Sequence, residues 1–299
     1  MPYNKPPKSY PDLAQLAIDR GLEGVTREHL TIVLERVSYC RFRTYWHKYL
    51  ADSINFKEDT NFGDIWIRYI FDGELRNLVF CAIQEVEVSL RNSIMHHHVH
   101  SHGIHGYLNA SALPDLKPTD RTKLLSRIKG EIDRTKEHFA KRHISQFPGE
   151  DPPLWIVVDL MTMGMLLTFY NGMKKNLRAA IASKYHVSEE VFNSWMKTLN
   201  HLRNICAHHS RLWNRTFGLS PKIPRERKNP EWHIPSKIYN ERTFGVLSMI
   251  YHLLKCTNSE FAVEWRGRLK NLFLGYGCEI PEEVGFPENW FEYQLWWVD

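Results

Sequence analysis

The sequence predicts an all-α fold, and three observations support this prediction. Several long segments carry apolar residues at intervals of three or four, as on one face of an amphipathic helix. No segment shows the apolar and polar alternation of a half-buried strand. The composition, with 43% hydrophobic and 24% charged residues in a chain of 299, is typical of a globular protein of one large domain or two ordinary ones. Disorder and fibrous folds are therefore excluded for most of the chain.

The first predicted helices lie in residues 1–55, an N-terminal helical segment. Residues 11–20 form a short helix that ends at Gly21. A second helix covers residues 26–50, because apolar residues recur there at helical spacing: Leu30, Val33, Leu34 and Val37. The polar residues 55–63 then form a loop.

The helix that begins at Asp64 is the clearest in the sequence. Seven apolar residues mark its buried stripe: Phe71, Leu75, Leu78, Ala82, Val86, Leu90 and Ile94. Gly, Asn and Pro in residues 101–118 predict a loop, and residues 119–147 predict a strongly charged helix that ends before residues 148–153. These elements open the predicted core segment, residues 56–220.

An apolar helix is predicted in residues 155–170. The surrounding stretch, residues 153–173, approaches the length of a membrane span. Asp159 interrupts it, and a carboxylate in mid-span costs roughly 2.5–3.5 kcal/mol on insertion scales. We therefore expect a buried core helix and no membrane association.

The last predicted helices lie between Ser188 and residue 274. Ser188 is predicted to begin a helix whose apolar face is formed by Val191, Trp195, Leu199, Leu202 and Cys206. Residues 221–235 form a basic loop interrupted by Pro, and residues 239–274 return to helix with a break near residues 257–258. Residues 221–299 are thus a third segment, and one continuous domain is the alternative division.

The cysteines and the N-terminus indicate a reducing compartment. The five cysteines are odd in number, scattered and never in a Cys-x-x-Cys pair: Cys40, Cys81, Cys206, Cys256 and Cys278. Neither a disulfide framework nor a zinc ribbon is indicated. Residues 1–8 are followed by no apolar run, so they do not resemble a signal peptide. We therefore expect a cytoplasmic protein.

Charge is distributed unevenly, although the net charge is only +5. Residues 203–228 contain seven basic residues and one acid, which gives +6. Residues 279–299 contain six acids and no Lys or Arg, which gives −6. A polyanion such as RNA is attracted to the first of these regions.

The residues with the most chemical potential cluster at the end of the helix that begins at Ser188. On an ideal helix, Arg203 and His208 lie about 7.5 Å apart along the axis, and Asn204 lies one turn before His208. A histidine near a fixed cation suits RNA cleavage by the 2′-hydroxyl, because His accepts the proton and Arg stabilises the phosphorane without a metal. The alternative is that Arg203 pairs with a core carboxylate and that His208 and His209 are ordinary helix-end residues.

The run from Leu199 to Arg215 resembles the signature of the Abi (abortive infection) family, AbiD/AbiF-like bacterial proteins. Further blocks resemble the same family: Lys5 to Tyr10 with Arg20 to Leu22, Tyr39 to Trp46, Tyr69 to Arg76, and Ile83 to Arg91. The resemblance covers roughly residues 5 to 217.

The resemblance implies a site and an activity. The family is grouped with the HEPN superfamily, whose helical proteins use an Arg-x4–6-His motif as a metal-independent endoribonuclease site, usually completed across a dimer. Arg203 and His208 are then catalytic, with Asn204 as the polar residue that often follows the Arg. We expect a HEPN-type domain with additional N- and C-terminal helices, a homodimer without cofactor, and RNA cleavage that restricts phage growth. The alternative is a non-catalytic RNA-binding or interaction module of a toxin-antitoxin or phage-defence system.

The basic region supplies the candidate RNA-binding residues, where RNA is a cellular target or a bound small non-coding RNA. They are His209, Arg211, Trp213, Arg215, Lys222, Arg225, Arg227 and Lys228. Trp213 beside Arg211 and Arg215 could stack a base, although a single Trp at a helix end is more often a core residue.

A second Arg-x4-His pattern runs from Arg91 to His96. Glu87 precedes Arg91 by four residues with the acid first, which favours an ion pair on one helix face, and a supporting role for the other Arg and His is the alternative. Six histidines fall in residues 96–105. Their irregular spacing favours a pH-sensitive or RNA-facing loop over a metal site.

Overall fold

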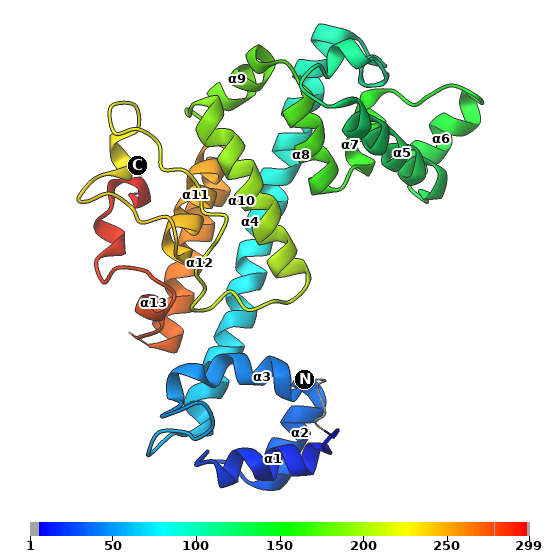
Figure 1. The fold of residues 1–299 in the computed structure, drawn as a ribbon. Helices are drawn as coiled ribbons and strands as arrows, with labels where there is room; N and C mark the ends of the chain where they lie inside the picture. The colour runs from blue at the N-terminus through cyan, green and yellow to red at the C-terminus, as the bar shows by residue number, and fades with distance from the viewer. Residues whose placement is uncertain (1–5, 278, 298–299) are drawn as a thin grey trace.

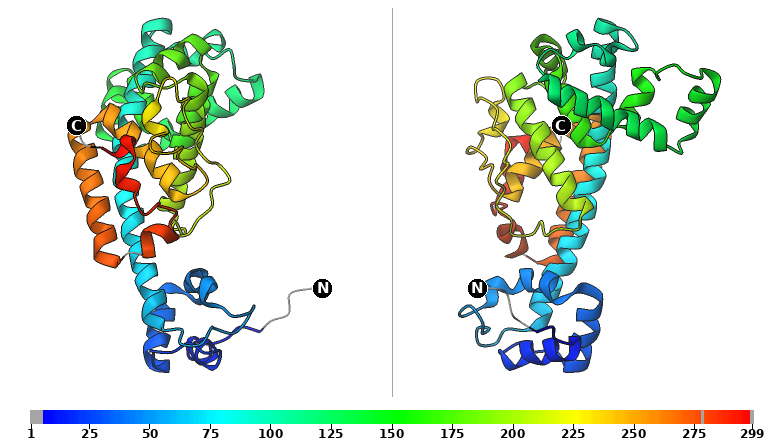
Figure 2. Two further views of the ribbon diagram at one scale, coloured as in Figure 1. Left: turned by 90° about the vertical axis from the view of Figure 1, so that its left-hand side faces the viewer. Right: turned by 45° about the vertical axis from the view of Figure 1, so that its right-hand side comes forward.

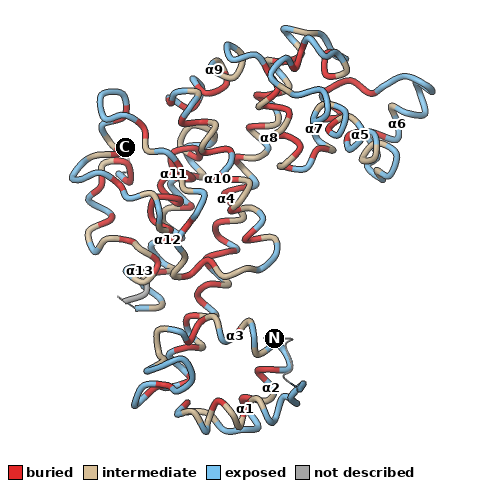
Figure 3. The backbone as a smooth tube through the Cα atoms, in the orientation of Figure 1, coloured by how far each residue is buried: buried red, intermediate tan, exposed pale blue. Residues whose placement is uncertain are grey.

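The all-α prediction is confirmed. The structure is a computed structural model that describes residues 6–277 and 279–297, and these residues form thirteen α-helices, six short 3-10 helices and no strand. The predictions that fall on residues 1–5, Cys278 and Asp299 lie outside the described residues. Buried apolar residues from most of the helices form the core (Figure 3).

Helix α4 (Phe62–His102) is the spine of the molecule. Its 41 residues correspond to about 60 Å, and both views of Figure 2 show it running from the N-terminal helices to the opposite end. Asn61 caps its start by accepting a hydrogen bond from the Gly63 N–H at 2.8 Å. The helix ends at Gly103, which has φ +77°. The prediction that the histidines of residues 96–105 lie in a loop is therefore wrong for residues 96–102, which belong to α4. The loop begins at Gly103.

The N-terminal helices lie beside the start of α4 (Figure 1). They are α1 (Tyr10–Asp19), α2 (Arg27–Val37) and α3 (Tyr39–Trp46). The single helix predicted for residues 26–50 is wrong, because Ser38 has φ +65° and its hydroxyl accepts a hydrogen bond from the Arg41 N–H. A residue that caps a new helix in this conformation cannot continue the previous one.

The middle of the chain packs at the other end of α4 (Figure 1). It comprises α5 (Pro118–Arg134), α6 (His138–Gln146), α7 (Leu154–Leu160), α8 (Met163–Gly172) and α9 (Lys175–Ser183). The predicted apolar helix is thus two helices, since Thr162 caps α8 through the Met165 N–H at 3.3 Å. No helix in the described part of the chain is both long and apolar enough to cross a membrane.

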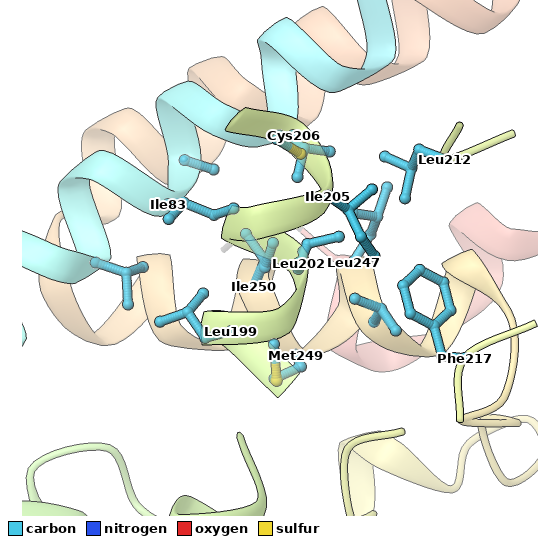
Figure 4. Close-up of a cluster of buried hydrophobic side chains, with 14 of the residues drawn as sticks. Ile83, Leu199, Leu202, Ile205, Cys206, Leu212, Phe217, Leu247, Met249 and Ile250 are labelled. Carbon is cyan, nitrogen blue, oxygen red and sulfur yellow. The ribbon is translucent and has the colours of Figure 1, made fainter. Parts of the chain in front are cut away.

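Helix α10 (Glu189–Ala207) lies along α4 and carries the predicted cluster at its carboxyl end. Ser188 is its N-cap, as predicted, and accepts a hydrogen bond from the Val191 N–H at 3.4 Å. The apolar side of α10 packs between α4 and α11 (Thr243–Thr257), as the close-up in Figure 4 shows for Leu202, Ile83 and Ile250. Burial of this face fixes the rotation of α10 about its axis and therefore fixes which residues remain accessible.

The chain after α10 turns back along the same helix. The Thr198 hydroxyl donates to the carbonyl of Leu219 at 3.2 Å, and the Lys222 N–H donates to the Ser194 hydroxyl at 2.9 Å. Helices α11, α12 (Ser259–Tyr276) and α13 (Glu279–Glu283) follow, and α12 begins at the predicted break. The contacts place residues 219–222 beside the first half of α10.

Candidate active site

The carboxyl end of α10 is closed by a Schellman motif that exposes two histidines. The Ser210 N–H donates to the carbonyl of Ile205 at 2.9 Å, and the His209 N–H donates to the carbonyl of Cys206 at 3.0 Å. His209 has φ +53°, in the position that glycine usually occupies. His208 and His209 are both exposed. They stand where the helix dipole favours a positive charge.

Arg203 is a half-buried cation without a partner among the described residues. Its Nε atom is buried and makes no hydrogen bond, and no carboxylate lies within ion-pair distance of its guanidinium group in that part of the chain. The alternative in which Arg203 pairs with a core carboxylate is therefore not observed. Asn204, on the next position of the helix, is exposed.

Arg203 lies near the end of α10, and His208 is the C-cap of that helix. The two are five positions apart, which on an ideal helix corresponds to about 7.5 Å along the axis and roughly 140° around it. No hydrogen bond joins the two side chains in the described structure. One chain thus offers one unpaired Arg and one exposed His of the motif at the carboxyl end of α10.

A buried carboxylate on α4 anchors the chain that follows the site. Asp72 is fully buried, and its Oδ1 atom accepts hydrogen bonds from the N–H groups of Leu212 at 3.0 Å and Trp213 at 2.5 Å. Its Oδ2 atom accepts from the Tyr45 hydroxyl at 2.5 Å and from Arg76, with which it forms an ion pair. This four-donor arrangement ties α3, α4 and the segment after α10 together.

The donors around Asp72 suit an ionised carboxyl group. Burial raises the pKa of the Asp72 carboxyl, and the Arg76 charge and the three donated hydrogen bonds oppose that shift. Burial and the adjacent carboxylate raise the pKa of Tyr45, so its hydroxyl remains a donor. Three of the four neighbours, the Leu212 and Trp213 N–H groups and the Arg76 guanidinium, can only donate, which favours the ionised carboxyl. Sequence reasoning missed this anchor, although Asp72 and Arg76 have the acid-first spacing of an ion pair.

Helix α3 brings further arginines to the end of α10. Arg41 donates a hydrogen bond to the carbonyl of His209, and Arg211 donates to the carbonyl of Thr44 at 3.2 Å. Arg43 is exposed on the same helix. We call four residues the cationic cluster, because none of them forms an ion pair in the described residues: Arg41, Arg43, Arg211 and Arg215.

Two members of the cationic cluster were missed by the sequence analysis. Arg41 and Arg43 alternate with aromatic residues in the block from Tyr39 to Trp46. That alternation was the available signal, but only the fold shows that the block lies against the end of α10. Burial, together with the nearby Arg43 and Arg211, lowers the pKa of His47, which lies just after α3.

Of the two roles considered for Trp213, the structure shows the core role, and its ring is not accessible for stacking a base. Its side chain is 1% exposed and stacks on Tyr45 with ring centroids 5.9 Å apart. Its Nε1–H donates to Glu283 of α13 at 2.9 Å. Trp213 is therefore a core residue that links the site to the C-terminal helices, and the Arg211 guanidinium covers its ring at 5.7 Å from the centroid.

The structure divides the predicted basic region into two places. Arg211 and Arg215 lie near His208, and the Arg215 guanidinium donates to the carbonyl of Arg211 at 2.9 Å. Lys222 instead forms an exposed ion pair with Glu190 at the start of α10, about 27 Å along the helix from His208. The next basic residues are exposed in the turn that follows: Arg225, Arg227 and Lys228. These four residues lie at the far end of α10 from the motif.

The second Arg-x4-His pattern has a structural partner. Glu87 and Arg91 form an ion pair in which both side chains are mostly buried, and Arg91 also donates to the carbonyl of Val158. No hydrogen bond joins either residue to Arg203 or His208. His96 is exposed on α4 and stacks on His100, with ring centroids 4.1 Å apart. Within the described residues, no three His, Cys, Asp or Glu side chains are arranged to hold a metal.

Comparison with known proteins identified a match to one protein family. A model of the family described as Abi-like protein matches residues 32–214. The matched range is more than half of the chain and includes α3, Asp72, α10 and the Schellman turn, and it ends before Lys222. No curated protein and no solved structure matched.

Proposed function

Because this chain belongs to the family of Abi-like proteins, we propose that it acts in abortive infection as an endoribonuclease of the HEPN type. In this proposal it cleaves RNA without a metal and restricts phage growth by stopping the metabolism of the host cell. Arg203 and His208 form the site, and Asn204 assists them.

The proposed reaction uses the ribose of the substrate as the nucleophile. His208 accepts the proton of the 2′-hydroxyl, and the 2′-oxygen then attacks the adjacent phosphorus. The bond to the 5′-oxygen breaks, and that oxygen takes up a proton from water or from a second histidine. Arg203 stabilises the charge on the phosphorane oxygens. The products are a 2′,3′-cyclic phosphate and a 5′-hydroxyl.

The observation that carries the proposal is the unpaired state of Arg203. A half-buried guanidinium normally has a carboxylate or a set of carbonyl acceptors, because an uncompensated buried charge is costly. Arg203 has neither among the described residues. No carboxylate or carbonyl of the described residues compensates the charge of the half-buried guanidinium group, and a phosphate beside the exposed His208 would do so.

A homodimer completes the proposed site. One Arg and one His are a sparse set for phosphodiester cleavage, and one histidine cannot serve as base and acid at the same time. A twofold axis near the carboxyl end of α10 would bring two Arg203 and two His208 side chains together. A monomer that cleaves RNA would contradict this part of the proposal and direct attention to Arg91 and His96.

Substitution of the two motif residues tests the proposal. Arg203→Ala and His208→Ala are each expected to reduce RNA cleavage by roughly 10²–10⁴-fold. Arg142→Ala and His138→Ala are matched controls, since both are exposed on α6 and both should retain wild-type activity. Circular dichroism checks that all four variants are equally helical. Full activity in either motif variant would refute the assignment.

A non-catalytic RNA-binding module is the second candidate. The observation that favours it is that no hydrogen bond joins Arg203 and His208 in the described structure, beside arginines that would hold phosphates without cutting them. Incubation of the pure protein with total RNA in EDTA separates the two functions. RNA that is bound and remains intact supports the binding module, and RNA that is cut supports the endoribonuclease.

A further inference from the structure

We propose that helix α3 forms half of the RNA-binding surface, with Arg41 and Arg43 holding phosphates of the strand whose cleaved bond lies at His208. This inference rests on the proposed function, because it names the surface that the substrate of that site would occupy. It places the N-terminal helices in the functional site and the exposed turn of residues 225–228 outside it.

The first step is the position of Arg41. Its guanidinium group donates to the carbonyl of His209, so it lies one residue from the proposed general base. An arginine has five N–H donors, and we find no other hydrogen bond from Arg41 in the described residues. The free donors can reach a phosphate that lies beside His208, and the fork geometry of arginine suits a phosphate.

The second step is the charge that surrounds Arg41. Arg211 lies against the same helix through the carbonyl of Thr44, and Arg215 is joined to the carbonyl of Arg211. Asp72, the carboxylate that holds the segment after α10, is fully buried and already paired with Arg76. Arg41, Arg211 and Arg215 are thus brought to the junction of α3 and the end of α10 without an ion-pair partner in the described residues, and Arg43 is exposed on the same helix as Arg41. A polyanion that binds there gains from each of them and releases its counterions.

The third step is the rigidity of α3. Its opposite face is buried through Phe42, Tyr45 and Trp46. The Tyr45 hydroxyl is bonded to Asp72, which also holds the segment after α10. Both sides of the surface are therefore fixed to one buried carboxylate. Donors held in place before binding lose little entropy when a phosphate arrives.

The surface is suited to the backbone of RNA more than to its bases. Trp213, whose ring the Arg211 guanidinium covers, and Tyr45 are both buried, so neither can stack a base. Contacts from arginines alone position a strand without reading its sequence. We therefore expect binding that is strongly dependent on salt and weakly dependent on sequence. An acidic protein is the competing ligand class.

Salt dependence of RNA binding tests the proposal. The His208→Ala protein is titrated with a fluorescent 20-nucleotide single-stranded RNA at several KCl concentrations, and variants are compared in that background. Arg41→Gln with Arg43→Gln should lower the slope of log affinity against log salt by about 1.4, since each lost phosphate contact contributes about 0.7 on a single strand. Arg127→Gln with Arg142→Gln is the matched control, because both residues are exposed in α5 and α6, and its slope should not change.

Two further variants keep the test decisive. Arg43→Gln alone removes an exposed side chain with no hydrogen bond in the described structure, so it should fold normally and lower the slope by about 0.7. Arg41→Lys should restore part of the affinity lost in Arg41→Gln. An unchanged slope in the α3 variants, or a loss confined to Arg225→Gln with Arg227→Gln, would overturn the proposal. Poly-glutamate that displaces the labelled RNA as well as unlabelled RNA does would also overturn the proposal, because the surface would then bind acidic proteins.

The outcome does not depend on catalysis. If the α3 variants lose RNA binding while the wild-type protein never cuts RNA, the surface is supported and the endoribonuclease is refuted. If the wild-type protein cuts RNA while the α3 variants bind it normally, only the surface is refuted.

Discussion

Replacing Asp72 by Asn would test whether one buried carboxylate organises the functional end of α10. In the wild-type protein, Oδ1 of Asp72 accepts from the N–H groups of Leu212 and Trp213, and Oδ2 faces Tyr45 and Arg76. The amide oxygen of Asn can keep the first pair of hydrogen bonds. Its NH₂ group then faces the Arg76 guanidinium, donor against donor, and the buried arginine loses its counter-charge.

The size of the effect follows from the burial of both partners. Asp72 is 0% exposed and Arg76 is 8% exposed, so water cannot replace the lost partner. Breaking a buried ion pair by removing one member costs about 3–5 kcal/mol. Asp72→Asn with Arg76→Met removes both charges, so its cost should be smaller than the sum of the two single costs by about 2 kcal/mol.

Urea unfolding of the four proteins, followed by circular dichroism, measures this coupling. The three variants should also bind RNA more weakly than wild type, because the anchor positions Arg211. Single costs that add to within about 0.5 kcal/mol in the double variant would refute the reasoning, since the two residues would then not interact.

Three other variants are expected to change the free energy of unfolding in different ways. His209→Gly should leave the free energy of unfolding unchanged or raise it by up to about 1 kcal/mol, because φ is +53° there, and it should weaken RNA binding; unchanged binding would remove His209 from the site. Burial, aided by His102, lowers the pKa of His98 to about 4, so the unfolded chain protonates first and stability falls as the pH drops from about 6.5 toward 4. His98→Leu should reduce that fall by about 2 kcal/mol between pH 8 and 5 in urea unfolding, and an unchanged pH profile would contradict it. Trp213→Phe should lose about 1–3 kcal/mol, because it removes the hydrogen bond to Glu283, with RNA affinity unchanged; lost affinity in a folded variant would show that Trp213 touches RNA.

Local pattern was sufficient for most helices because their apolar stripes are regular. The stripe from Phe71 to Ile94 predicted α4, and Ser188 predicted the start of α10. The pattern failed where a cap divides a continuous apolar run, as Ser38 and Thr162 do. Apolar spacing continues across such a residue, so only the backbone conformation shows the break.

The candidate site was predictable only as far as it lies on one helix. Arg203 and His208 were predicted as site residues because they lie close together in the chain, within a run that resembles a family signature, and this assignment stays a prediction. Asp72 and Arg41 reach the site from more than a hundred residues away, and no local pattern records such a contact. The same reason explains why the sequence left two roles open for Trp213, whose burial depends on Tyr45 and Glu283 from distant segments.

The chemistry of the RNA ends tests the central claim most directly. Purified wild-type protein is incubated with a labelled RNA in EDTA, and the products are compared with those of the His208→Ala and His138→Ala proteins. The account predicts a 2′,3′-cyclic phosphate and a 5′-hydroxyl from the wild-type and His138→Ala proteins, and intact RNA from His208→Ala. A 2′-deoxy substitution at the cleaved position should block the reaction. Intact RNA with the wild-type protein, cleavage that requires added metal, or equal cleavage by His208→Ala would contradict it.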